Sequence, residues 1–146
     1  RQFKFFNTID VDNAYCYLEK GIVRSIGASV RSILNLDFED VAKRIRVLLG
    51  KEQDPYDTFD YLLDLQKKYQ FESIYFFLLA DYGYNDKNID VNSKKFQSLV
   101  KSMSDYVKVG IHPSWASNSD SGKLSTEIMR LEGMVNREVV RSRQHF

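Results

Sequence analysis

Two aspartates and two histidines stand at the ends of apolar, strand-like stretches of this chain. Asp10 and Asp12 follow the first stretch, His112 follows the third and His145 follows the last; the chain has no other histidine. In a parallel sheet the carboxyl ends of the strands meet at one edge, where α/β proteins place their chemistry. Carboxylates and imidazoles are common ligands of zinc and related divalent metals. The pattern therefore predicts a divalent-metal site suited to hydrolysis.

The elements that must position these residues alternate between two kinds of hydrophobic pattern. Apolar runs predict strands at 2–9, 72–80 and 107–111 and a further strand from 139, and helical spacing predicts helices at about 37–49, 58–69, 93–103 and 124–136. Residues 13–34 carry mixed signals. The resulting β-α-β-α-β-α-β order predicts an α/β fold with a parallel sheet, either doubly wound or part of a (β/α) barrel.

Four strands are too few to close a barrel, and no internal repeat or interdomain linker is evident. We therefore expect residues 1–146 to form a single unit that is an N-terminal fragment of a larger barrel domain. The last predicted strand has no helix after it to cover its edge, and an uncovered edge pairs readily with another chain. A homodimer through this exposed sheet edge is the expected consequence.

Composition limits the classes of partner. The 146 residues are 43% hydrophobic and 14% aromatic, and 21 basic residues against 20 acidic ones give a net charge of +1. Without a basic block, nucleic acid is not an expected partner. A single cysteine, Cys16, excludes an internal disulfide. No run reaches the roughly 20 apolar residues of a membrane span and no signal peptide is recognisable, so the compartment is left open.

Each candidate residue also has a purely structural interpretation. Asp10 and Asp12 can cap the turn after their strand, and a histidine at a strand end is often only hydrogen-bonded. Gly110 allows another backbone or a ligand to come close beside His112. Arg143 either holds a catalytic carboxylate in a bidentate contact or is an ordinary surface charge.

Aromatic residues are frequent in the loops that follow the predicted strands, where such rings commonly stack on sugars. Packing in the core or at its rim is the alternative for each of them. Taken together, the cluster favours a carbohydrate-like ligand; its members are Trp115, Tyr15, Tyr17, Tyr56, Tyr82 and Tyr84.

Three short motifs resemble those of the polysaccharide deacetylases, carbohydrate esterase family four. The stretch from Thr8 to Asp12 is similar to the first motif, His112 to Trp115 is similar to the second, and Ser142 to Phe146 falls where the arginine-bearing third motif is expected. The resemblance implies a distorted (β/α) barrel, usually of seven strands, whose remaining motifs would lie beyond Phe146.

By this resemblance Asp10 is the general base and Arg143 orients it, while Asp12 and His112 bind zinc or another divalent metal. The second motif normally ends in a second histidine, but this chain has Ala116 there; His145 is the candidate replacement. We predict that Trp115, Ser117 and Tyr15 bind the glycan substrate. The leaving amine is usually protonated by a downstream histidine, which this chain lacks, so the fragment alone is expected to be inactive.

The sequence therefore leads to three hypotheses. The first is a metal-dependent hydrolase that removes acetyl groups from an N-acetylated glycan. The second is a non-catalytic relative that binds glycan or has a structural role, motivated by Ala116. The third is a receiver-like signalling domain, which the sequence disfavours because the third strand ends in His112 where that fold needs an aspartate.

Overall fold

The computed structural model describes residue 3 and residues 5–144. The described chain divides into two compact units. The first, here called the sheet unit, contains the chain up to Ala14 and the chain from Thr58 onward. The second, here called the hairpin unit, is Tyr15–Asp57. Each unit is described by itself.

The sheet unit is a three-stranded parallel sheet with helices between its strands. The strands lie in the order β1-β2-β3, and the elements of this unit are β1 (Phe6–Val11), α3 (Phe59–Tyr69), β2 (Glu72–Leu78), α4 (Lys94–Tyr106), β3 (Lys108–His112) and α5 (Ser121–Val135). A short 3-10 helix, η1 (Ala116–Ser119), precedes α5. The predicted mixed α/β fold with a parallel sheet is confirmed.

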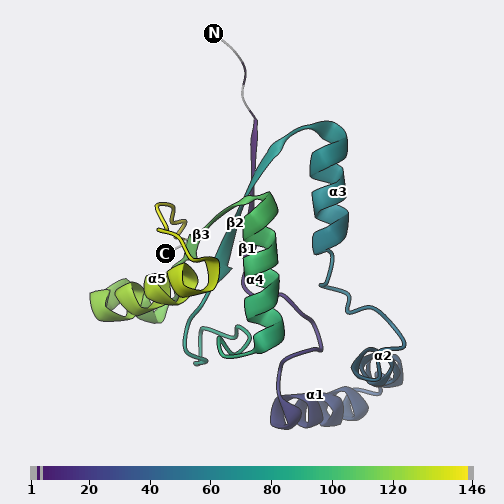
Figure 1. The fold of residues 1–146 in the computed structure, drawn as a ribbon. Helices are drawn as coiled ribbons and strands as arrows, with labels where there is room; N and C mark the ends of the chain where they lie inside the picture. The colour runs from purple at the N-terminus through teal and green to yellow at the C-terminus, as the bar shows by residue number, and fades with distance from the viewer. Residues whose placement is uncertain (1–2, 4, 145–146) are drawn as a thin grey trace. The chain divides into compact units, whose positions relative to one another are not determined.

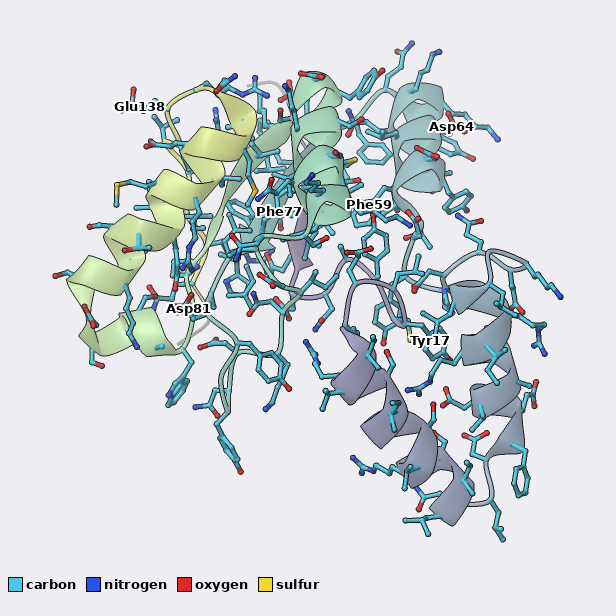
Figure 2. All side chains as sticks on the ribbon, turned by 60° about the horizontal axis from the view of Figure 1, so that its bottom comes forward. Tyr17, Phe59, Asp64, Phe77, Asp81 and Glu138 are labelled. Atoms are coloured by element: carbon cyan, nitrogen blue, oxygen red, sulfur yellow. The ribbon has the colours of Figure 1, made fainter. Side chains whose placement is uncertain are left out.

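One face of the sheet forms the core with the helices. Tyr75, Phe77 and Ile111 alternate along the strands and are almost fully buried. Phe77 lies beside α4 (Figure 2), and its ring meets that of Phe96 edge to face at 6.4 Å. Helices α4 and α5 pack on β3 and on each other (Figure 1). This close packing makes the sheet a rigid platform for the residues at its carboxyl edge.

The opposite face of the sheet carries Asp10 and His112 together with apolar residues of the central strand. The registers Asp10↔Phe76 and Phe76↔Gly110 place these three residues side by side on that face. A Cβ atom on Gly110 would lie 2.7 Å from the Phe76 ring and 2.7 Å from the carbonyl oxygen of Arg141. The expected close approach at Gly110 is therefore made by a ring on one side and by backbone on the other.

Two strand predictions need correction. The first strand extends through Asp10 to Val11, so Asp10 lies within β1 instead of after it. The predicted fourth strand is reduced to one parallel bridge, between Ile111 and Ser142, although Arg143 N also donates to Ile111 O at 3.1 Å. Val139 and Val140 lie outside the sheet, and the Val139 N–H donates to the Glu132 carboxylate at 3.1 Å.

The hairpin unit contains α1 (Ile22–Leu34) and α2 (Phe38–Leu48), which contact each other across a short connection (Figure 1). Helix α2 was predicted, and the Asp37 side chain caps it by accepting from Asp40 N at 3.0 Å. Helix α1 was not predicted. It starts at Gly21 without a side-chain cap, and its serines and internal glycine weaken the sequence signal.

Polar groups occupy the centre of the hairpin unit. Asp40 accepts hydrogen bonds from Tyr17 Oη and Ser32 Oγ, both at 2.7 Å, and from Arg44 at 2.8 Å; Tyr17 lies close to α2 in Figure 2. Hydrogen bonding to the Ser32 and Tyr17 hydroxyls and to Arg44 lowers the pKa of Asp40. Burial raises the pKa of the Cys16 thiol, which disfavours the thiolate.

Apolar side chains lie on the outside of the same unit. Ile45 and Leu48 on α2 and Leu49 directly after it are exposed, whereas Val47 is buried. The exposed apolar residues of α1 and the connection are Ile22, Val23, Ile26, Val30, Ile33, Leu34 and Leu36. None of the described helices is both long enough and apolar enough to span a membrane.

Candidate functional site

The carboxyl edge of the sheet brings Asp12 and His112 together. Asp12 follows β1 directly and His112 is the last residue of β3, on the far side of Leu78 in the central strand. Their side chains meet with His112 Nε2 3.3 Å from Asp12 Oδ1. The residue His112 is 4% exposed, whereas the Asp12 side chain is 60% exposed. The pair therefore combines a fixed imidazole with a carboxylate that solvent can reach.

Asp10 and Arg143 form a second pair on the same face of the sheet. Arg143 Nε lies 3.6 Å from Asp10 Oδ2, and the other end of the guanidinium donates to Thr8 Oγ1. The Asp10 side chain is mostly buried. The contact reaches from the segment beside β3 to β1 and places a guanidinium next to the Asp10 carboxylate.

A pocket of about 210 Å³ opens beside the Asp12–His112 pair. Trp115 lines it and is about half exposed, as expected for a ring that can contact a ligand. The remaining lining residues are Asn13, Leu78, Asn85, Asp86, Lys87 and Pro113. A second pocket of about 260 Å³ shares Trp115, Asn85 and Asp86 with the first and contains Tyr82, Tyr84 and Arg130. Two small adjoining pockets thus meet at Trp115.

Two buried carboxylates hold the loop that carries Trp115. Asp86 accepts hydrogen bonds from the backbone N–H groups of Trp115 at 2.9 Å and Ala116 at 3.3 Å. Glu127 of α5 accepts from Ser114 N at 3.1 Å and from the Ser114 hydroxyl. Such charge-assisted bonds to backbone are strong, so the loop is held firmly against α5 and the β2–α4 loop.

Sequence reasoning missed both of these supporting carboxylates. Glu127 falls among the apolar positions Leu124, Ile128 and Leu131 of α5, and an acidic residue at such spacing is the available signal for a buried, bonded carboxylate. Asp86 lies in a loop rich in Asp and Asn, where the sequence cannot distinguish it from its neighbours.

Three further predicted site residues are Ser117, Tyr15 and His145. Ser117 is buried in η1, where its hydroxyl donates to Ser114 O at 2.9 Å. Tyr15 belongs to the hairpin unit and is buried; burial and nearby negative charges raise its pKa. His145 lies outside the described residues. Within the described part of the chain, no cluster of three or more His, Cys, Asp or Glu side chains has a metal-binding arrangement.

Comparison with known proteins gives no assignment: no protein-family model, curated protein or solved structure matches this chain.

Proposed function

We propose that the carboxyl edge of the sheet is the active site of a metal-dependent hydrolase that removes acetyl groups from an N-acetylated glycan. The observation that carries the proposal is the 3.3 Å contact between Asp12 and His112 at the mouth of a pocket. The fixed Asp10–Arg143 pair on the same face supports it. These four residues are those to which the deacetylase motifs assign metal binding and base catalysis.

The Asp12–His112 pair has donor chemistry that fits a divalent cation. Zinc binds imidazole nitrogen and carboxylate oxygen at about 2.0–2.1 Å, so two ligands of one tetrahedral zinc lie about 3.3 Å apart. The observed separation of 3.3 Å matches this value. Catalytic zinc sites generally have three protein ligands, so these two residues would form part of the ligand set.

Asp10 is the proposed general base. Its carboxylate is oriented by Arg143 and lies in β1, two residues before Asp12. It would accept the proton of the water that attacks the acetamide carbonyl. A bound divalent metal would acidify that water and polarise the carbonyl. Arg143 then acts as a positioning residue, because it holds the base in one orientation.

The sizes of the two pockets suit one substituent of a sugar and the sugar ring that bears it. The pocket of about 210 Å³ at Asp12 and His112 is smaller than typical ligand pockets of roughly 300–1,000 Å³. Its size favours a group such as an acetamide over a whole sugar. Trp115 separates this pocket from the second one, where Tyr82 and Tyr84 offer further aromatic surface. A sugar ring stacked on Trp115 would place its substituent next to Asp12.

The sheet has features that favour a segment of a (β/α) barrel. Its strand order β1-β2-β3 never reverses, whereas a doubly wound sheet has a switch point. In a flat sheet the segment beside β3 would lie about 14 Å from β1, at roughly 4.8 Å per strand. The contact between Asp10 and Arg143 reaches across that width, over the position of Gly110, which has no side chain. We propose that this face lines a barrel.

The experiment is a comparison of metal binding and deacetylation in single variants of the full-length protein. We expect His112→Ala and Asp12→Asn to lose zinc binding by titration calorimetry, and Asp10→Asn to keep zinc binding while acetate release from chito-oligosaccharides stops. Asp105→Asn, on the exposed side of α4, is the matched control. Equal zinc affinity in the wild type and His112→Ala contradicts the proposed metal site.

A non-catalytic glycan-binding role is the second candidate, and Ala116 favours it. This residue stands where the motif has its second histidine, and its backbone N–H is bound to Asp86. If the full-length protein binds chito-oligosaccharides and Trp115→Ala weakens that binding, but no acetate is released with any divalent metal, this second function replaces the first.

A further inference from the structure

One polar atom beside the Asp12–His112 pair is buried without a hydrogen-bond partner. Asn13 lines the pocket of about 210 Å³ together with that pair. The Oδ1 atom of its side-chain amide is buried, and none of the described residues donates a hydrogen bond to it. Buried oxygens of this kind are rare in folded proteins and often mark the position of a bound water or ion.

The local backbone allows Asn13 to act at the same place as Asp12. Strand β1 ends at Val11, and the chain bends at Asp12. Within a strand, neighbouring side chains point to opposite faces of the sheet. Because the strand has already ended, Asp12 and Asn13 are not bound by this alternation, and both line the one pocket. Two consecutive residues can therefore offer oxygen atoms to a single ion.

The other residues that line this pocket leave few alternatives for a further ligand. Besides Asp12, the side chains with an oxygen atom are Asn13, Asn85 and Asp86. The two carboxylate oxygens of Asp86 already accept the backbone N–H groups that hold the Trp115 loop. Asn85 is exposed, so water satisfies its amide. Among the described lining residues, Asn13 alone has a side-chain oxygen that is buried without a hydrogen-bond partner.

We propose that Asn13 Oδ1 is the third protein ligand of the metal, beside Asp12 and His112. The inference rests on the proposed function and names a further residue of the same site. Catalytic zinc sites generally have three protein ligands. No third His, Cys, Asp or Glu side chain of the described chain joins this pair in a metal-binding arrangement. Asn13 thus supplies the donor that is missing where the chain has Ala116.

One nitrogen donor and two oxygen donors define the class of ion. Imidazole suits zinc, whereas carboxylate and carbonyl oxygens suit harder cations such as Mn²⁺. The amide oxygen of Asn13 is neutral, so Asp12 is the one ligand of the three with a negative charge, and a divalent ion keeps a net positive charge in the site. We expect the site to bind Mn²⁺ as well as zinc, and to discriminate less between them than a site with two imidazoles does.

The test is titration calorimetry of the full-length protein with Zn²⁺ and, separately, with Mn²⁺. Asn13→Ala should weaken zinc binding by at least about tenfold, a loss that is typical even for residues that only support a ligand. Asn13→Asp should bind zinc at least as tightly as the wild type, because a carboxylate oxygen replaces the amide oxygen. The matched control is Asn85→Ala, which changes the same residue type in the same pocket and should bind zinc like the wild type.

Melting temperatures measured with and without zinc separate metal binding from a purely structural role. Without metal, Asn13→Asp should melt below the wild type, because its buried carboxylate has no partner. With zinc, its melting temperature should recover to that of the wild type. If Asn13 only holds a water molecule, zinc leaves the deficit of Asn13→Asp in place, and that result overturns the inference.

The outcomes distinguish this inference from the proposed hydrolase. If Asn13→Ala keeps its zinc affinity while His112→Ala loses it, Asn13 is not a ligand and the hydrolase proposal stands. Loss of zinc in His145→Ala but not in Asn13→Ala gives the third position to a histidine and equally overturns the inference. Zinc binding that depends on Asn13, with no acetate released, supports the ligand set and contradicts the hydrolase. A wild type that binds neither metal contradicts both.

Discussion

The two units of this chain solve the problem of burying polar and apolar groups in opposite ways. The sheet unit has an apolar interior around Phe77 and Ile111 and displays its polar groups at one edge. The hairpin unit buries the charged residues Arg44 and Asp54 and leaves most of its aliphatic residues exposed, although Val47 is buried. The contrast shows that an amphipathic pattern does not by itself tell which side of a helix faces inward. The hydrogen-bonding and packing partners available to each side decide it.

The largest expected difference between the units comes from removing an apolar side chain. Phe77→Ala should lower the free energy of unfolding by about 3–5 kcal/mol, because it leaves a cavity between β2 and α4. Ile26→Ala, on the exposed side of α1, should change it by less than about 0.5 kcal/mol. Urea unfolding followed by circular dichroism measures both. If Ile26→Ala lowers the free energy of unfolding as much as Phe77→Ala does, the apolar side of α1 is buried in solution.

Removing a polar side chain from the hairpin unit should have the next largest effect. Asp54 accepts hydrogen bonds from the backbone N–H groups of Cys16, Tyr17, Leu18 and Tyr56. Asp54→Ala should cost about 2–3 kcal/mol because these donors lose their acceptor. Asp64→Ala, on the exposed side of α3, is the control and should be nearly neutral in the same unfolding assay. If Asp54→Ala leaves the free energy of unfolding unchanged, the hydrogen bonds to Asp54 do not stabilise the hairpin unit.

Acid should weaken the hairpin unit through its two carboxylates. Burial alone would raise the pKa of Asp54, but its backbone hydrogen bonds lower it overall, and the pKa of Asp40 is lowered as well. A lowered folded-state pKa means that the unfolded state takes up protons first as the pH falls. The stabilisation is therefore complete above about pH 5 and is lost below it. Urea midpoints between pH 7 and 3 should fall less steeply for Asp40→Asn; an unchanged slope would exclude this cause.

The smallest expected effect concerns two residues with positive φ, one in each unit. Leu36 and Asn136 have φ values of +58° and +54°. Leu36→Gly should raise the free energy of unfolding by about 0.5–1 kcal/mol, because leucine is strained there. Asn136→Gly should change it by only a few tenths, because asparagine tolerates this region. Differential scanning calorimetry of the two variants measures the difference between these gains in stability. An equal gain in both variants would mean that Leu36 carries no special strain.

The sequence predicted the sheet unit better than the hairpin unit for a physical reason. The run from Ile74 to Leu79 and the helical spacing around Phe96 report burial directly, and both elements formed where expected. Helix α1 keeps its aliphatic stripe but interleaves it with Ser25, Gly27 and Ser29, which are weak helix formers. The side of α1 that faces α2 is polar, so the usual rule that apolar residues are buried does not hold for this helix.

At the candidate site, the sequence predicted which residues come close but not how they are supported. The meeting of Asp12 and His112 follows from parallel strand order alone, because both end their strands at one edge. The support from Asp86 and Glu127 depends on how two loops and α5 pack together. Such long-range hydrogen bonds leave no periodic trace in the sequence. The metal-binding and catalytic roles stay predictions.

Gly110 makes the sheet face that carries Asp10 unusually sensitive to substitution. Any other residue there would bring its Cβ atom within 2.7 Å of the Phe76 ring and of Arg141 O, just before the residues that lead to Arg143. Substitution would thus push apart the chain segments that carry the Asp10–Arg143 pair, at a distance from any ligand. In a saturation screen for function, position 110 should tolerate as few substitutions as position 10, and variants selected for recovery should map to Phe76.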